Sequence, residues 1–313
     1  MGQILFRIVL AIALLAASLA RADSAPHDRA DVLALAQRGW VFDFRSSLFR
    51  RDPDLPPVRF DARTTARGSI CIFGETPHPL SREVIGAFEA LLVDLFARSA
   101  PIIFAGRGIA DCPARQRIYL RLYSGAPPAG DFNRDLRELD RAFGIGLPRD
   151  RPERISSPAQ AIGFFGRRGD TAHMLVRQPP PGATGPLERT FHISILLEEL
   201  FQVVSWGVDI LKFDREARFM SKLQEYPTNL RHLSWEAPDY MRALLASNPN
   251  ALCPFDIFML HALAASDLDT VNTPALLGHL EAGFDALKAR AEATVADPRF
   301  AILIDGSCAR LPP

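Results

Sequence analysis

The sequence has 313 residues, enough for one large domain or two small ones. Apolar residues make up 48% and charged residues 23%, proportions typical of globular proteins, which excludes an intrinsically disordered chain and a multi-span membrane protein. Lys+Arg and Asp+Glu each number 36, so the chain lacks the excess positive charge expected of a nucleic-acid-binding protein. Among the cations, three are lysines: Lys212, Lys222 and Lys288.

Residues 1–22 are typical of a secretory signal peptide. Arg7 supplies the cationic start, residues 8–17 form an unbroken apolar run, and Ala-Arg-Ala at 20–22 matches a cleavage pattern. The run is too short to span a bilayer, which requires about 20 residues. We therefore expect a mature chain that begins at Asp23, has no stable membrane insertion and is periplasmic or secreted.

The cysteines favour disulfide bonds. An even number of them in an oxidising compartment suggests two bridges, and four cysteines allow three connectivities. None of the spacings is C-x-x-C, which argues against a thiol redox motif or a zinc ribbon. We favour the connectivity that keeps each bridge within its own half of the chain, and free reactive cysteines are the alternative. The favoured pairs are Cys71 with Cys112, and Cys253 with Cys308.

The order of predicted elements indicates an α+β fold. After an N-terminal leader at 23–66, with one helix at 28–38 and otherwise loose packing, strands and helices interleave. Apolar runs predict strands at 69–73, 101–104, 117–123, 162–165, 173–176 and 300–304. Amphipathic patterns predict helices at 81–98, 131–143, 189–206, 254–265 and 274–296, with Ser81 and Asp256 as N-caps. We expect residues 67–313 to form a single domain with a mainly helical second half.

The predicted helix at 189–206 carries the most informative pattern. One face is broadly apolar, and the opposite face gathers polar side chains interrupted by Phe191, Ile195 and Trp206. This face is expected either to be an ordinary solvated surface or to line a polar groove. Its polar residues are His192, Ser194, Glu198, Glu199, Gln202 and Ser205.

Residues 198–209, with the sequence EELFQVVSWGVD, resemble the signature E-E-L-x-Q-x-x-G-L-x-x-D of a family of exported bacterial proteins of unknown function. Residues 221–223 and 254–263 resemble two further segments of that family, so the resemblance covers roughly residues 115–270. The family is regarded as related to zincin metallopeptidases. The resemblance therefore implies a zincin-like fold, with a small mixed sheet packed on the motif-bearing helix.

Set beside the zincin H-E-x-x-H pattern, Glu198 takes the first metal-ligand position, Glu199 the general base and Gln202 the second ligand. A catalytic zinc requires imidazole or carboxylate ligands, an open coordination position and a base for the bound water. Gln202 is a poor zinc ligand. The usual third position falls on Val208, which cannot coordinate, although Asp209 follows it. Ser205 replaces the glycine of the signature, so we expect a degenerate metal site.

These observations lead to two functional hypotheses. The first is an exported zincin-like protein without peptidase activity or cofactor, a binding or envelope-associated module whose partner is an unknown ligand or envelope protein. The alternative is a metal-dependent hydrolase in which zinc is held by Glu198, Gln202 and Asp209 or a distant histidine, with Glu199 as the base. The histidines considered as distant ligands are His232, His261 and His279.

Overall fold

The computed structural model describes residues 28–44, 46–47, 50–51, 57–97, 102–114, 116–148, 150, 152–182 and 184–312. The expected signal peptide and its cleavage site lie outside these ranges. Within them, no helix combines the length and the apolar character needed to cross a bilayer.

The described residues form a mixed five-stranded sheet in the order β4-β3-β5-β7-β6. Neighbouring strands β4, β3, β5 and β7 run parallel, and the edge strand β6 runs antiparallel to β7. A tight hairpin joins β6 to β7, where Gly169 adopts φ +119°, a conformation that favours glycine. The strands are β3 Ile70–Gly74, β4 Ile103–Phe104, β5 Ile118–Tyr123, β6 Ala159–Gly166 and β7 Gly169–Arg177.

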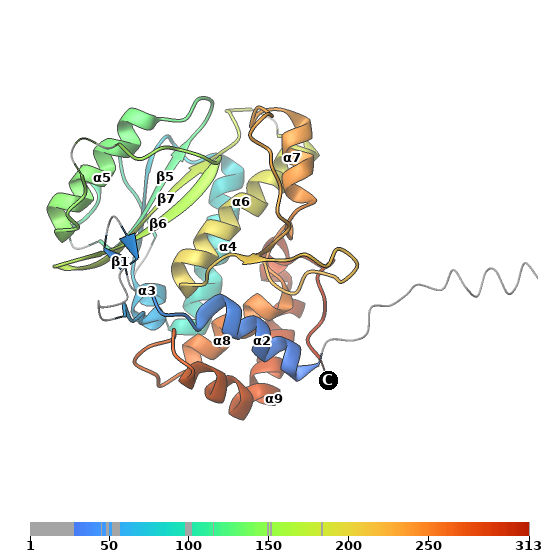
Figure 1. Ribbon diagram of the computed structural model, residues 1–313. Coiled ribbons are helices and arrows are strands. Elements are labelled where there is room, and N and C mark those ends of the chain that lie inside the picture. Colours follow the sequence, from blue (N-terminus) through green and yellow to red (C-terminus); the bar gives the residue numbers. More distant parts are fainter. Residues whose placement is uncertain are drawn as a thin grey trace, which may run out of the picture.

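Helices cover both faces of this sheet (Figure 1). Helix α5 packs on one face over a smaller apolar cluster, and α4 and α6 pack on the other within the main core. Helices α8, α9 and α2 lie beneath α4 and α6 in the same view. The helices are α2 Arg29–Trp40, α3 Ala62–Arg67, α4 Pro79–Phe96, α5 Ala129–Phe143, α6 Pro186–Ser205, α7 Pro238–Leu245, α8 Pro254–Ala265 and α9 Ala275–Ala296.

The α+β class, the small mixed sheet against the motif-bearing helix and the mainly helical second half are confirmed. The sequence pattern did not reveal α3 or α7. It also did not reveal the two-residue pairings of β1 Ser46–Ser47 with β2 Arg50–Arg51, and of β8 Ile210–Leu211 with β9 Gln224–Glu225. These elements are too short to show a hydrophobic period.

The expectation of a loosely packed leader is wrong for α2. Asp28 caps this helix through the backbone N–H of Asp31, and its inner face is fully buried. Trp40 lies 6.1 Å from Phe201 of α6 and 6.0 Å from Phe255 of α8, centroid to centroid. The Arg- and Asp-rich composition of the segment hid this apolar face.

Three local expectations need correction. Helix α4 begins at Pro79 rather than after Ser81, because His78 caps it by accepting from Leu80 N, and Ser81 is buried inside the first turn. The segment predicted as a strand at 300–304 is the 3-10 helix Pro298–Leu303. Its only sheet-like contact among the described residues is an isolated bridge between Leu252 and Ile304, so no partner strand extends it. Asp256 is the third residue of α8 rather than its N-cap.

Both expected disulfides are present. Cys71–Cys112 joins β3 to the segment after β4, and Cys253–Cys308 joins the start of α8 to the C-terminal segment. Each closes a loop, of 41 and 55 residues respectively, within its own half of the chain. These bridges fit a protein that folds in an oxidising compartment.

Replacing either cysteine pair by serine is expected to lower the free energy of unfolding by about 3–4 kcal/mol, because loop closure no longer restricts the unfolded chain. Urea denaturation under oxidising conditions measures this difference. In excess reductant the wild type and both variants should converge, and an unchanged midpoint in either oxidised variant would contradict the prediction.

Candidate functional site

Helix α6 carries the signature residues through the centre of the molecule. It packs against the sheet, α4 and α8, so that most of its circumference is buried. Its polar residues therefore meet protein rather than water. Two segments from the second half reach them: residues 220–225, which include β9, and residues 247–250, which precede α8.

The ammonium of Lys222 lies at the centre of this region. The residue is fully buried, at 0% exposure. Lys222 Nζ donates to Ser194 Oγ at 2.8 Å and to the carbonyl oxygen of Pro249 at 2.7 Å, and it lies 3.0 Å from Glu198 Oε2. The same carboxylate oxygen accepts from Asn248 Nδ2 at 2.9 Å. The charge of Glu198 is thus neutralised by a cation of the chain itself.

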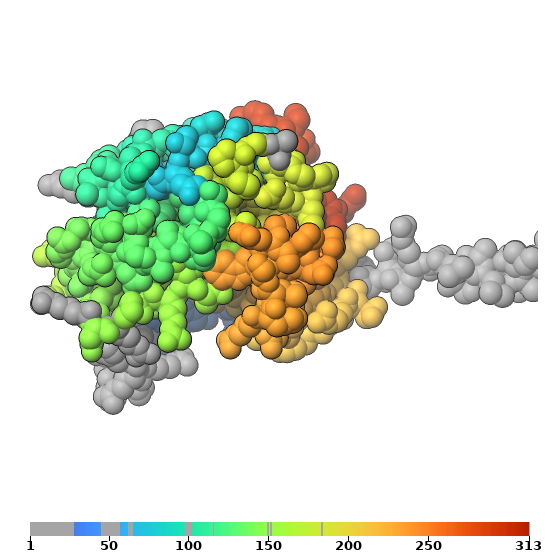
Figure 2. Space-filling view, turned by 90° about the horizontal axis from the view of Figure 1, so that it is seen from above, coloured from blue at the N-terminus to red at the C-terminus, as the bar shows by residue number. Residues whose placement is uncertain are grey.

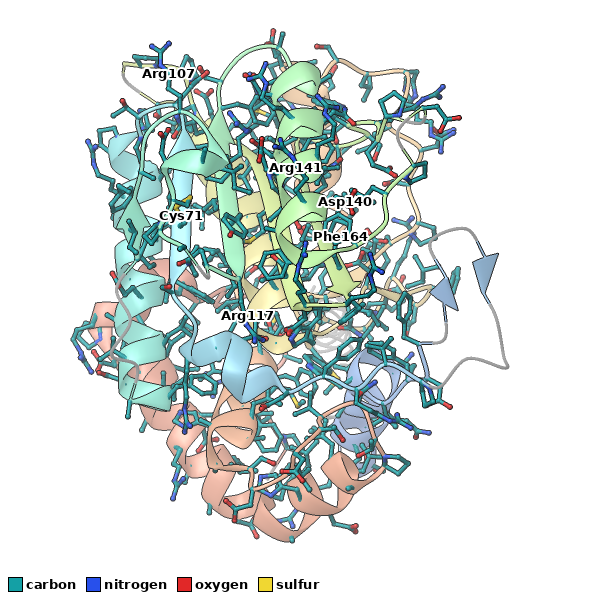
Figure 3. All side chains as sticks on the ribbon, turned by 90° about the vertical axis from the view of Figure 1, so that its left-hand side faces the viewer. Cys71, Arg107, Arg117, Asp140, Arg141 and Phe164 are labelled. Carbon is teal, nitrogen blue, oxygen red and sulfur yellow. A yellow bond between two sulfur atoms is a disulfide. The ribbon has the colours of Figure 1, made fainter. Side chains whose placement is uncertain are left out.

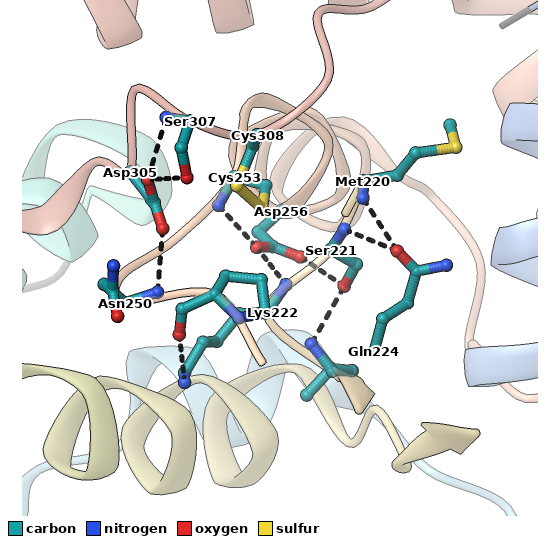
Figure 4. Close-up of a disulfide and its surroundings, with 12 residues drawn as sticks. Met220, Ser221, Lys222, Gln224, Asn250, Cys253, Asp256, Asp305, Ser307 and Cys308 are labelled. Atoms are coloured by element: carbon teal, nitrogen blue, oxygen red, sulfur yellow. Dashed lines mark hydrogen bonds between the residues drawn. A yellow bond between two sulfur atoms is a disulfide. The ribbon is translucent and has the colours of Figure 1, made fainter. Parts of the chain in front are cut away.

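Asp256 fixes the loop that presents this lysine (Figure 4). Its carboxylate accepts from Ser221 Oγ at 2.6 Å, from Lys222 N at 2.8 Å and from Cys253 N at 2.7 Å. Burial raises the pKa of Asp256 to about 7, against the effect of these hydrogen bonds. The Cys253–Cys308 disulfide lies beside this carboxylate, so the covalent bridge and the lysine loop support one another.

Glu199, the residue at the general-base position, is buried and its Oε2 atom has no hydrogen-bond partner. Burial raises its pKa well above the usual value, and the neighbouring charges of Glu198 and Asp209 raise it further, against the opposite effect of Lys222. These surroundings favour the protonated form of Glu199, in which the carboxyl group does not act as a base.

Gln202 and Asp209 meet each other at the far end of the motif. Gln202 Nε2 donates to Asp209 Oδ1 across the turn that follows α6. Burial, followed by the charges of Glu198 and Glu225, raises the pKa of Asp209 to about 7. Four acids, Glu198, Glu199, Asp209 and Glu225, therefore share the single ammonium of Lys222.

These donors do not fit a zinc ion. Glu198 Oε2 already has two donors, Gln202 directs its amide N–H toward Asp209, and the raised pKa of Glu199 disfavours the ionised form that binds a metal. Nowhere in the described part of the chain do three or more His, Cys, Asp or Glu side chains converge as metal ligands would. The histidines proposed as distant ligands have other surroundings. His261 Nε2 contacts Thr294 Oγ1, His279 Nε2 contacts the carbonyl of Ala262, and His232 lies in the loop before α7.

The three residues expected to line a polar groove are instead buried. His192 Nδ1 contacts the carbonyl of Arg177 at 3.1 Å and its Nε2 contacts Ser81 Oγ at 2.9 Å, which ties α6 to β7 and α4. Burial lowers the pKa of His192 to about 4, so the ring is neutral. Ser194 donates to Pro249 O, and Ser205 Oγ accepts from Gly207 N. Helical periodicity places these residues on one face but does not show that the face is covered.

The turn after α6 forms without the signature glycine. Trp206 adopts φ 55°, a left-handed conformation that costs free energy for a non-glycine residue. Its indole N–H donates to Thr65 Oγ1 at 2.8 Å, and its ring stacks on Phe60 at 4.8 Å. A side chain at Gly207 would collide with Leu223 and Trp40, so glycine is needed there for close packing.

Beside this turn is a cavity of about 280 Å³, here called the aromatic cleft. It lies between the C-terminal end of α6, the edge strand β6 and the chain that follows α2. Its polar lining is Gln202 and Asp209. Its other lining residues include Phe42, Phe44, Phe60, Ala161, Gly163, Phe165, Trp206 and Val208.

Sequence reasoning did not find Lys222 or Asn248 as members of the site. The serine-containing segment 221–223 was recognised only as part of the family resemblance, with no role for the lysine. The one other signal was the rarity of lysine in the chain. Comparison with protein-family models, curated proteins and solved structures gives no significant match to this chain.

Glu199→Gln should become more stable relative to the wild type as the pH rises from 5 to 8. In the wild type the folded protein keeps the Glu199 proton, whereas the unfolded chain loses it above its ordinary pKa, so rising pH favours unfolding. Glutamine does not titrate, so the variant lacks this contribution to the pH dependence of the free energy of unfolding. Urea denaturation of both proteins at pH 5 and pH 8 should give a relative gain above about 1 kcal/mol. A constant difference would mean that Glu199 is ionised in the folded protein.

Lys222→Met should lower the free energy of unfolding by about 3 kcal/mol or more, because Glu198 would keep a charge without its partner. The double variant Lys222→Met/Glu198→Gln should recover part of this loss. Lys288→Met is the control, since Lys288 is half-buried, its pair with the exposed Glu292 spans 3.9 Å, and this pair is expected to contribute less than about 1 kcal/mol. Equal losses from the two lysine substitutions, measured by urea denaturation, would contradict a central role for Lys222.

Proposed function

We propose that this protein is an exported, non-catalytic binding module on a zincin-like scaffold, and that it binds an extended peptide segment of another protein in the aromatic cleft. The observation that carries the proposal is the buried ammonium of Lys222, 3.0 Å from the carboxylate at the first metal-ligand position. A cation that belongs to the chain takes the place that the resemblance would assign to a metal ion.

The acid–base state of the motif supports a non-catalytic role. Water activation at a zinc site needs an ionised carboxylate near an open coordination position. Burial and the neighbouring charges raise the pKa of Glu199, which disfavours its ionised form, and Glu198 is engaged by Lys222 and Asn248. What the motif does instead is hold α6 against the loop at 220–225.

The aromatic cleft has the features of a peptide-binding site. Strand β6 pairs only with β7 in the described part of the chain, which leaves the backbone groups of its outer edge available for a further strand. Ala161, Gly163 and Phe165 alternate along β6 and line the cleft. A peptide added beside β6 would place every second side chain on this same side of the sheet. The cavity of about 280 Å³ has room for one large apolar side chain.

The polar lining of the cleft adds a preference for charge. Asp209 lies in the cleft with Gln202, and loss of hydration, followed by the charges of Glu198 and Glu225, raises its pKa to about 7. A cationic side chain on the ligand would relieve this repulsion and favour the ionised carboxylate. We therefore expect a ligand with an aromatic or large aliphatic residue and a basic residue two positions away.

The two disulfides fit export, and the location proposed from the N-terminal pattern is the periplasm or the cell exterior. There, unfolded or extended segments of envelope proteins are available to an edge strand. The envelope association proposed from the sequence would then come from such contacts.

The test is binding of the capped pentapeptide Thr-Phe-Thr-Lys-Thr to the full mature chain in a Trp40→Phe/Trp235→Phe background, followed by the fluorescence of the remaining Trp206, which lines the cleft. We expect saturable binding and recovery of the intact peptide with and without added zinc. Phe165→Ala should weaken binding at least about fivefold, because it removes a wall of the cleft. Phe213→Ala, at an exposed phenylalanine outside the cleft, is the matched control and should bind as the wild type does.

Two further peptides separate the contributions. Replacing the outer threonines by proline removes backbone donors and should abolish binding, and replacing lysine by glutamate should weaken it. Equal binding of the proline peptide would overturn the edge-strand mode. Zinc-dependent cleavage that is lost in Glu199→Gln would overturn the non-catalytic assignment.

A further inference from the structure

A second and larger cavity lies away from the aromatic cleft, at the edge of the sheet where the parallel strands β3, β4 and β5 end. Its volume is about 680 Å³, within the range of small-molecule sites. Figure 2 looks onto this end of the molecule, where the segments that follow the three strands come together. The cavity is here called the arginine pocket after three of its lining residues, Arg82, Arg107 and Arg121. Arg107 is labelled at this end of the sheet in Figure 3.

The strand order explains why a crevice forms here. From β3 the chain passes through α4 to β4 on one side, and then returns to β5 on the other side of β3. Helix α4 packs on the α6 face, whereas Ile109, in the connection from β4 to β5, belongs to the apolar cluster under α5. Connections that leave neighbouring parallel strands toward opposite faces open a crevice at their carboxyl ends, the usual ligand position in such sheets.

Arg121, on β5, is fixed in place at the floor of the pocket. The residue is only 5% exposed. Its Nε and Nη2 donate to the two oxygens of Asp135 at 2.5 and 2.8 Å, and its guanidinium lies 4.8 Å from the ring centroid of Phe73. Burial alone would raise the pKa of Asp135, but hydrogen bonds from Arg121 and His173 lower it below its usual value.

The remaining guanidinium nitrogen, Nη1, is not used by this pair. It lies beside Gly74, where a β-carbon would be 3.4 Å away, and both residues line the pocket. The absence of a side chain at position 74 therefore leaves Nη1 accessible from the cavity. A donor held by a buried carboxylate loses little conformational entropy when it binds a ligand.

Arg82 and Arg107 supply further positive charge. Their guanidinium groups make no hydrogen bond or ion pair with any other residue that the structure describes. Of the acids of the pocket, Asp131 is paired with Arg134 Nη1 at 2.7 Å, whereas Glu75 accepts from the neutral Ser124 Oγ at 2.7 Å. With one carboxylate against the two guanidinium groups of Arg82 and Arg107, the excess charge of the pocket is positive.

We propose that the arginine pocket binds a small organic anion, through a carboxylate or phosphate group held by Arg121, Arg82 and Arg107. Planar guanidinium groups form charge-assisted, often bidentate hydrogen bonds with both kinds of oxyanion. This site is separate from the aromatic cleft and shares no lining residue with it. Its test is therefore independent of the proposed peptide-binding function.

The experiment measures the thermal stability of the mature protein against increasing concentrations of 3-phosphoglycerate or succinate, each compared with sodium chloride at equal ionic strength. We expect a saturable rise in Tm with at least one anion that sodium chloride does not reproduce. Arg82→Gln/Arg107→Gln should raise the apparent Kd at least tenfold. Both residues are exposed, so the melting temperature without ligand should stay unchanged.

Arg218→Gln/Arg231→Gln is the matched control, because it removes two exposed arginines away from the pocket. It should bind the anion as the wild type does. A response to 3-phosphoglycerate alone shows that the phosphate is required, and a response to both probes shows that a carboxylate is sufficient. The proposal is overturned if neither probe exceeds sodium chloride, or if the Arg82→Gln/Arg107→Gln variant retains wild-type affinity.

Discussion

The structure of the signature region depends on one buried ammonium. Lys222 has no contact with water, and a lysine in that position is stable only when several oxygens replace its hydration. Ser194, Glu198 and the carbonyl of Pro249 provide them from two separate segments of the chain. Helix α6, the loop at 220–225 and the segment before α8 must therefore be assembled together for the charge to be tolerated.

This requirement also decides the chemistry of the surrounding acids. One ammonium does not balance four neighbouring carboxylates, so the pKa of the most buried acid rises furthest from its usual value. That acid is Glu199, and loss of hydration together with the charges of Glu198 and Glu225 raises the pKa of Asp209 to about 7. Two glutamates and an aspartate around a helix could also bind a divalent cation. In this protein Lys222 and Asn248 contact Glu198 instead.

Much of the fold was predictable because its elements bury long periodic faces. The spacing of apolar residues predicts helices α4, α6, α8 and α9 and the strands of the sheet. The positions of the cysteines in the two halves of the chain predict the disulfide pairs. The errors occur where tertiary contacts override local pattern. The apolar residues at 300–304 alternate like a strand but have only Leu252 as a backbone partner, and α2 carries its buried face within a highly charged segment.

The site was less predictable than the fold. Periodicity correctly placed Glu198, Glu199 and Gln202 on one side of α6, but it cannot reveal what covers that side. Lys222 comes from a loop 24 positions after Glu198, and no local spacing rule connects the two residues. The burial of His192 and Ser194 likewise depends on neighbours from α4, β7 and the segment before α8, and Ser205 lies against Trp40 of α2, whose indole N–H donates to its carbonyl oxygen.

The positions of the two cavities follow from the directions in which the strands of the sheet run. Parallel strands bring their carboxyl ends to a common edge, and there the chain gathers Arg82, Arg107 and Arg121 around a polar pocket. The antiparallel strand β6 instead ends the sheet beside α6, pairs only with β7 among the described residues, and lies next to the aromatic rings that line the cleft. In the arginine pocket, Arg121 is held by residues that lie outside the cavity. Its partner Asp135 comes from α5, on the face of the sheet opposite α6, and His173 of β7 contacts the same carboxylate. A sheet with both faces covered can therefore carry a charged cavity at one edge and a largely apolar cavity at another, and the binding proposed for either cavity requires no metal ion.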